Sequence, residues 1–238
     1  MHRVDISAGC ACDIPSHAYT LNFALNPDWS RFFSYTPDIQ NYLAEVVEVF
    51  DLRKYMTFNT EVVRSEWQDD NGKWKVSLRQ KSPSGETKEW GEECDLLFYA
   101  TGILNNYKWP QIKGMEKFKV WVVHTAVWPE DYQEKEWENE RVAVIGLGAS
   151  SIQTVPKMQL HAKHLDIFVR TGVWFVQIAN NFGQNKEHSQ EERDEFRHDP
   201  KKLVAHAKDI ENQVNGLWTA STPAGKHRWA CSSCSGRG

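Results

Sequence analysis

The chain has 238 residues, which is long enough for one large domain or two small ones. Hydrophobic residues make up 40% and charged residues 25%, as in ordinary globular proteins, and the net charge of −4 argues against binding of nucleic acid. No stretch approaches the roughly 18 apolar residues of a membrane span, and the start lacks an apolar signal core. The five cysteines have no regular spacing, which favours a reducing compartment, and we expect the cytoplasm.

The first half of the chain predicts loops, one helix and a small antiparallel sheet. Residues 1–35 are aromatic and loop-like. Apolar residues recur at helical spacing over 36–52, after a Thr-Pro pair typical of a helix start. Residues 56–80 predict two strands, an Asp-Asn-Gly turn and a third strand, with tryptophans packed at the edges of a β-meander. The continuous apolar run within 92–102 predicts a strand buried on both faces that stops at Gly102.

The second half begins with a connector, residues 103–140, and then changes to strand, turn, helix, strand. The segment "RVAVIG" (141–146) predicts a buried strand, "GASSIQTVPKMQLHAK" (148–163) a helix, and "HLDIFVRT" (164–171) a second strand. Residues 184–212 are highly charged and show a weak helical pattern.

The glycine-rich turn between the first strand and the helix is typical of a dinucleotide-binding unit. Two glycines and one serine fill the three special positions of G-x-G-x-x-G, and the last position often holds another small residue for close helix–strand packing. The helix start offers free N–H groups and the positive end of its dipole to phosphates, and the two serines offer hydroxyl donors. An ordinary strand-to-helix turn is the alternative. The predicted cofactor-binding residues here are Gly146, Gly148, Ala149, Ser150 and Ser151.

Arg170 stands where the second strand ends, at the place where an NAD enzyme would put Asp or Glu. Asp166 lies within the strand, which is too early for that role. A guanidinium suits the 2′-phosphate of NADP, so Arg170 favours NADP over NAD. A solvated charge at a strand end is the alternative interpretation.

Four motifs in order resemble the flavin-containing and Baeyer–Villiger monooxygenases, over about residues 8–180. The segment "GCACDIPSHAYTLNF" (9–23) is similar to the family segment that reaches the flavin. The resemblance implies that Asp13 is the active-site aspartate, which helps to hold an arginine that stabilises the flavin peroxide anion. From the residues alone, Asp13 would be a turn residue before Pro15.

The segment "DLLFYATG" (95–102) resembles the family strand that ends against the cofactor. Its matching residues are Ala100, Thr101 and Gly102. A glycine there lets backbone approach a ligand closely. A buried strand with a glycine stop is the alternative.

The segment "FKVWVVHTAVWP" (118–129) is similar to the Baeyer–Villiger fingerprint F-x-G-x-x-x-H-x-x-x-W-[P or D]. The matching residues are Phe118, His124, Trp128 and Pro129, while Val120 stands where the glycine belongs. Glycine allows a backbone shape that valine resists. The family fingerprint lies between two cofactor domains, and it implies that His124 supports domain movement and catalysis. The segments "VAVIGLGASSIQ" (142–153) and "FVRT" (168–171) resemble the NADPH turn and its arginine.

The resemblance implies an α/β, Rossmann-like flavoprotein fold with two partial dinucleotide-binding domains and a small β-meander. We expect a partial FAD domain over 1–117, a linker over 118–140 and a partial NADPH domain over 141–238. The implied cofactors are FAD and NADPH, and the implied partners are a small organic substrate and molecular oxygen. The family's earlier FAD glycine turn and its active-site arginine have no counterpart here, so we expect an impaired internal fragment with poor solubility and weak FAD binding.

The implied reaction converts a ketone to an ester or lactone through a C4a-peroxyflavin. Oxygenation of nitrogen or sulfur is one alternative, and a fragment that binds NADP without catalysis is another. A third alternative is a thiol redox pair or zinc half-site at Cys231 and Cys234, completed by Cys10 and Cys12.

Overall fold

The computed structural model describes residues 7–102, 106–173 and 185–221, with side chains to residue 216. The chain folds as two compact units, one built on Ala44–Tyr132 and the other on Ala8–Leu43 together with the residues from Gln133 onward. Helix α1, Thr36–Val49, begins in the second unit and ends in the first. Among the described helices, none combines the length and apolar character needed to cross a membrane.

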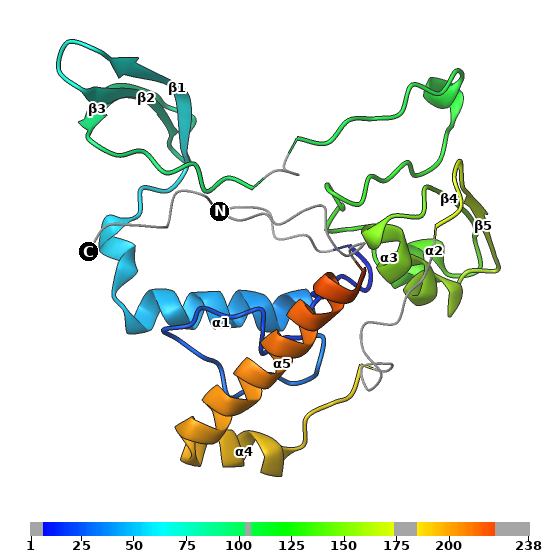
Figure 1. Cartoon of the computed structure of the whole chain (residues 1–238). Coiled ribbons are helices and arrows are strands. Elements are labelled where there is room, and N and C mark those ends of the chain that lie inside the picture. Colours follow the sequence, from blue (N-terminus) through cyan, green and yellow to red (C-terminus); the bar gives the residue numbers. More distant parts are fainter. Residues whose placement is uncertain (1–6, 103–105, 174–184, 222–238) are drawn as a thin grey trace. The chain divides into compact units, whose positions relative to one another are not determined.

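The sheet of the first unit has three antiparallel strands in the order β1-β2-β3 (Figure 1). These strands are β1 Thr60–Gln68, β2 Lys73–Lys81 and β3 Thr87–Cys94. Gly72, with a φ of +65°, closes the Asp-Asn-Gly turn. Trp67 lies opposite Trp74, with ring centroids 5.6 Å apart, and such cross-strand aromatic pairs stabilise sheets. The predicted β-meander is therefore confirmed. Its strands are placed differently, because residues 56–80 hold two strands rather than three, and the third strand, β3, follows the second as a further hairpin.

The predicted strand after this sheet does not form. Strand β3 ends at Cys94, and residues 95–102 follow as irregular chain without a strand partner among the described residues. Leu96 is 67% exposed and Phe98 81% exposed. An apolar run is stable as a strand only when neighbouring strands take its backbone groups and both faces are covered. The prediction of a strand buried on both faces is therefore wrong for this structure.

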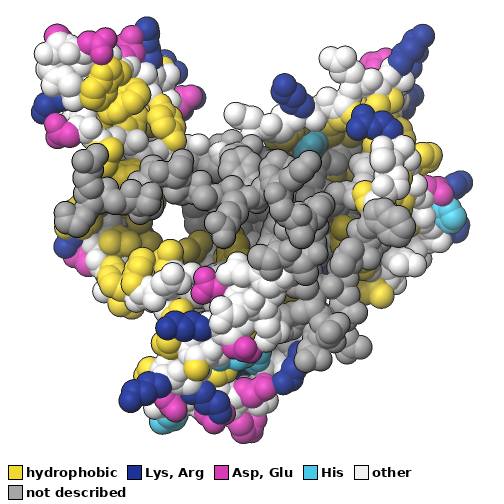
Figure 2. All heavy atoms as spheres, viewed as in Figure 1, with side chains coloured by type: hydrophobic (Ala, Val, Ile, Leu, Met, Phe, Trp, Pro, Cys, Tyr) yellow, Lys and Arg dark blue, Asp and Glu magenta, His cyan; other side chains and the backbone are white. Residues whose placement is uncertain are grey.

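The remaining elements of the first unit are short. Two 3-10 helices, Leu52–Tyr55 and Met115–Lys117, interrupt otherwise irregular chain. Hydrophobic side chains gather on the part of the three-stranded sheet that faces the viewer in Figure 2. Val62 and Trp67 are about half exposed. The first unit therefore leaves much of its apolar surface uncovered.

The second unit contains the predicted strand–turn–helix–strand. Strands β4 Arg141–Ile145 and β5 His164–Phe168 pair in parallel, and α3 Ala149–Gln159 connects them (Figure 1). The buried residues of α3 are Ser151, Thr154 and Met158, which lie on one face of the helix. The short helix α2, Glu134–Trp137, precedes β4. The Rossmann-like α/β prediction is confirmed, although α3 ends before the predicted residue 163. The prediction of a buried strand over 141–146 is wrong for this structure, because the residues of β4 alternate between exposed and half-buried and Ile145 is 63% exposed.

The hydrophobic core of the second unit lies between the loop of residues 8–35 and three helices. These are α1, α4 Gln190–His198 and α5 Pro200–Ser221. The buried apolar side chains there include Trp29, Phe32, Tyr42, Phe196, Leu203 and Ile210. Helix α4 begins with a capping box, because the Ser189 hydroxyl accepts from the Glu192 N–H and the Glu192 carboxylate accepts from the Ser189 N–H.

The buried face of α1 differs from the predicted apolar stripe. Leu43 and Phe50 are exposed, while Tyr42 is only 5% exposed. The Tyr42 hydroxyl accepts from the Leu21 N–H at 2.8 Å and donates to the Ala24 carbonyl at 2.9 Å. A tyrosine is buried where its hydroxyl finds partners, and the loop supplies them. The helix itself was predicted correctly.

Candidate functional site

Strand β4 ends directly at the predicted dinucleotide turn. Gly146 follows Ile145 with a φ of +106°, in the left-handed region that favours glycine. The Gly146 N–H donates to the Phe168 carbonyl of β5 at 2.9 Å. The turn therefore lies at the carboxyl ends of both parallel strands, where α/β folds bind their ligands.

The start of α3 fits the phosphates of a dinucleotide. Gly148 is the N-cap residue, and no side chain caps the helix. The first N–H groups of a helix lack partners within the helix, so they can donate to an anion. A Cβ placed on Gly146 or Gly148 would meet no atom within 4 Å, so the space beside the turn is open to a ligand.

The two serines of the turn differ in exposure. Ser150 is half-buried, whereas Ser151 is buried and its Oγ has no hydrogen-bond partner among the described residues. Ser151 therefore packs within the unit, as a small residue at the third glycine position does. Ala149 and Ser150 lie nearer to the surface.

Arg170 is exposed and lies two residues after the end of β5. The structure places it after the same strand ends that carry the glycine turn. Asp166 lies in the middle of β5, where it pairs with Arg141 at 3.6 Å and His164 at 3.0 Å. The carboxylate of Asp166 is thus engaged within the strands.

Asp13 is exposed and follows a short extended stretch, and we call residues 9–13 the Asp13 segment. The Cys12 N–H donates to the Ser34 carbonyl at 3.0 Å, and the Thr36 N–H donates to the Cys10 carbonyl at 3.1 Å. Burial raises the pKa of the Cys12 thiol, so the thiol stays protonated at neutral pH. The Cys12 side chain thus faces the interior, whereas the next side chain, that of Asp13, is exposed to solvent.

A hydrogen-bond network around Ser16 holds the same loop. Ser16 and Ser34 are almost completely buried. The Ser34 N–H donates to the Ser16 Oγ at 2.8 Å, and the Ser16 N–H donates to the Phe32 carbonyl at 2.7 Å. The Ser16 Oγ lies 3.0 Å from the Arg31 and Phe32 carbonyl oxygens, so its proton has an acceptor. The network joins the Asp13 segment to residues 31–34.

His124 of the first unit lies in a tight aromatic turn. Its Nδ1 accepts from the Ala126 N–H at 3.1 Å, and its ring lies 4.7 Å from Tyr107 and 5.4 Å from Trp109 between ring centroids. Trp128 is buried, and its indole N–H donates to the Tyr132 carbonyl at 2.7 Å. These contacts fix the turn that carries His124.

The backbone φ angles of Val120 and Gly102 bear on two of the family motifs. The φ of Val120 lies outside the left-handed region, so valine is accepted there without strain. Gly102 has a φ of +74°, which favours glycine. Ala100, Thr101 and Gly102 are exposed, and their contact with a cofactor stays a prediction.

A cluster of three histidines, of which His17 is buried and the other two are half-buried, was not predicted from the sequence. The His17 ring lies 5.1 Å from that of His188 and 4.7 Å from that of His206, with Phe196 at 5.3 Å. Burial, and then the two other histidines, lower the pKa of His17 to about 3. Residues so distant in sequence give no local signal of their contact. Within the described residues, no group of three potential ligands could hold a metal ion, and Cys231 and Cys234 lie outside those residues.

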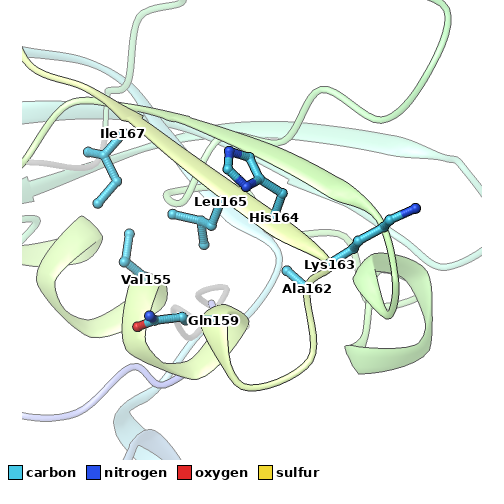
Figure 3. A pocket seen from close by; sticks show the side chains of 7 residues that line it. All are labelled: Val155, Gln159, Ala162, Lys163, His164, Leu165 and Ile167. Carbon is cyan, nitrogen blue, oxygen red and sulfur yellow. The ribbon is translucent and has the colours of Figure 1, made fainter.

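A shallow hollow of about 430 Å³ lies beside the second half of α3. Figure 3 shows Val155 and Gln159 of α3 facing Leu165 and Ile167 of β5 across it. The α3 residues that line the hollow come from the second half of the helix, and none belongs to the glycine turn, so the hollow is separate from that turn. The side chain of Lys163, which also lines the hollow, points away from it in this view (Figure 3).

Comparison with known proteins identifies relatives of this chain. Residues 16–193 match the model of the flavin-binding monooxygenase-like family. The FAD-binding monooxygenase moxY of Dothistroma septosporum is 62% identical over 209 residues, which cover 87% of this chain and 33% of that protein. A Baeyer-Villiger monooxygenase of Streptomyces coelicolor is 40% identical over 168 residues, which cover 71% of this chain and 30% of that protein.

A solved structure also resembles this one. Cyclohexanone monooxygenase from a Rhodococcus species, bound to NADP+, superposes with a TM-score of 0.66 at 28% identity, over 84% of this chain and 35% of that one. The chain thus spans about a third of the length of these relatives. Since the family model covers most of its residues, the chain belongs to the flavin-binding monooxygenase-like family.

Proposed function

We propose that this chain carries the NADPH-binding site of an FAD- and NADPH-dependent monooxygenase, whose whole length converts a ketone to an ester or lactone with molecular oxygen. One observation carries the proposal: strand β4 leads through Gly146 and Gly148 into an uncapped helix start. The names of the relatives, FAD-binding and Baeyer-Villiger monooxygenases, support the same reaction class. We place the cofactor domains as the sequence predicts, over 1–117 for FAD and 141–238 for NADPH.

The residues of the turn take separate roles in this proposal. The N–H groups of Ala149 and Ser150 bind the pyrophosphate, and the guanidinium of Arg170 binds the 2′-phosphate. Ser151 keeps α3 close to the strands. When bound, FAD supplies the oxygenating chemistry and NADPH supplies the hydride, while the protein supplies position and charge.

The residues outside the turn serve the flavin in this proposal. Asp13 orients a cationic group at the reaction centre, as a carboxylate can by pairing with a guanidinium. Residues 100–102 let backbone approach the flavin. His124 supports the linker of residues 118–140 between the two cofactor domains.

The fingerprint favours Baeyer–Villiger chemistry over oxygenation of nitrogen or sulfur. His124 and Trp128 stand at their fingerprint positions and are held by named contacts. Val120 replaces the fingerprint glycine without backbone strain, so the substitution leaves the segment intact. Conversion of a ketone by the whole protein tests this choice, and formation of an N-oxide or sulfoxide alone would contradict it.

Replacing Arg170 with alanine is expected to weaken NADPH binding about tenfold and to leave NADH binding unchanged. A charge-assisted hydrogen bond contributes about 1.5–3 kcal/mol, and only NADPH has the 2′-phosphate that receives it. The binding constants are measured by titrating the purified chain with each nucleotide and following tryptophan fluorescence or heat.

Arg141→Ala is the matched control, because Arg141 is an exposed arginine at the opposite end of the strand pair. It should leave the preference for NADPH unchanged. Equal affinities of the original chain for NADPH and NADH, or a loss in the control as large as in R170A, would contradict the role of Arg170.

A further inference from the structure

The backbone of Ala11 is held by a side chain 142 residues further along the chain. The Gln153 side-chain oxygen accepts from the Ala11 N–H at 3.1 Å, and the Gln153 side-chain nitrogen donates to the Ala11 carbonyl at 2.9 Å. One amide thus pairs with both polar groups of one residue, as a neighbouring strand would. These two hydrogen bonds join the Asp13 segment to helix α3.

The other edge of the segment is also paired. Cys12 and Cys10 bond to Ser34 and Thr36, respectively, on the side away from Gln153. Backbone groups of successive residues point in opposite directions along an extended chain, so the segment is held from both sides. The Gln153 side chain completes one of these two sides.

Gly9 brings the segment into contact with the helix backbone. It has a φ of +77°, and a Cβ at this position would lie 2.6 Å from the Gln153 carbonyl oxygen and 3.3 Å from the Lys157 Cβ. That approach is closer than a side chain allows. The segment therefore lies directly against α3, with Gln153 at the centre of the contact.

Helix α3 begins at Ala149, so Gln153 lies about one turn beyond the helix start that we assign to the phosphates. Asp13 lies two residues after Ala11. A helix moves as a rigid element, and therefore a ligand that fixes the start of α3 also fixes the Gln153 amide. The same amide holds the backbone that leads to Asp13.

We propose that Gln153 is a positioning residue, which couples occupancy of the nucleotide turn to the position of the Asp13 segment. The proposal rests on the proposed function, because the ligand is the nucleotide assigned to that turn. Coupling between two sites is reciprocal, so a chain without the Gln153 contact should bind the nucleotide less tightly and hold the segment less firmly.

The test measures hydrogen exchange of individual amides in the full chain, with and without NADP+. The Cys12 amide is the reporter, because it bonds to Ser34 and keeps that partner when Gln153 is changed. In the original chain, NADP+ should slow its exchange at least about fivefold, which is the low end of typical coupling. In Gln153→Met, which keeps length but loses both hydrogen bonds, NADP+ should slow it less than twofold.

Gln159→Met is the matched control, since Gln159 is an exposed glutamine at the end of the same helix. It should keep the full effect of NADP+ on Cys12. Gly9→Ala is an independent variant that pushes the segment off α3 while it leaves Gln153 intact, and it should lose the effect as Gln153→Met does.

The outcomes separate the two proposals. If NADP+ protects the first amides of α3 while Gln153→Met and Gly9→Ala keep the slowing of Cys12, the coupling is overturned and the proposed function stands. If NADP+ protects no amide of α3 in the original chain, both are overturned.

Discussion

Lowering the pH from 7.5 to 5 is expected to reduce the free energy of unfolding of the second unit by about 2 kcal/mol through His17 alone. In the folded protein, burial lowers the pKa of His17 to about 3 from the ordinary 6.5. Below pH 6.5 the His17 ring is protonated in the unfolded chain but stays neutral in the folded chain. The contribution to stability is therefore complete above pH 6.5 and is lost as the pH falls toward 3.

The neighbours of His17 act in the same direction. Burial also lowers the pKa of His188 and of His206, although Glu192 opposes the shift of both and Asp209 opposes that of His206. Protonation of these rings is disfavoured in the folded state for the same reason. The total loss on acidification should therefore exceed the part due to His17.

Urea unfolding at pH 7.5, 6 and 5, followed by tryptophan fluorescence, measures this loss. His17→Phe keeps an aromatic ring beside Phe196 but removes the titrating nitrogens. Below pH 6.5 the slope of its unfolding free energy against pH should therefore be smaller than that of the original chain, and the difference between the two slopes should be about 1.4 kcal/mol per pH unit. His198→Phe changes an exposed histidine of α4 and should retain the original slope. An equal slope in the chain with and without His17 would contradict the prediction.

Replacing Ser16 with alanine is expected to destabilise the second unit by about 2 kcal/mol. The substitution removes the acceptor of the Ser34 N–H, and Ser34 is fully buried, so no water can replace the lost oxygen without opening the loop. A buried donor without a partner carries its full desolvation cost. The free energy of unfolding from urea titration at pH 7.5 measures the effect.

Ser84→Ala provides the comparison, because Ser84 lies exposed in the turn between β2 and β3 and bonds only to the Ser82 hydroxyl among the described residues. Its stability should lie within about 0.5 kcal/mol of the original. A loss for S16A as small as that for S84A would show that the network contributes little.

The elements with a local signal could be predicted from the sequence. The Asp-Asn-Gly turn fixes the hairpin of β1 and β2, and the order strand, Gly146, helix fixes the candidate site within a few residues. Helix α1 follows from its apolar spacing. In each case the decisive residues lie within one turn or one hairpin of each other, so periodicity and turn chemistry are sufficient.

The features without a local signal could not be predicted. Tyr42, rather than Leu43, is buried because a loop twenty residues earlier provides partners for its hydroxyl. The pairing of Gln153 with Ala11 and the contact of His17 with His188 and His206 join distant parts of the sequence. An apolar run such as 95–102 indicates that its side chains need burial, but the run does not show whether other strands and helices are available to bury them.

Helix α4 is attached to the loop before α1 by charges as well as by its apolar face. Arg197 of α4 pairs with Asp28, and Glu187, which lies just before α4, pairs with Arg31 at 2.8 Å, both near the surface. Concentrated salt screens such pairs, while acid acts on the histidines packed beneath the same helix. High ionic strength and low pH should therefore both destabilise the attachment of α4. A buffer with concentrated salt at low pH should destabilise this protein more than either condition alone.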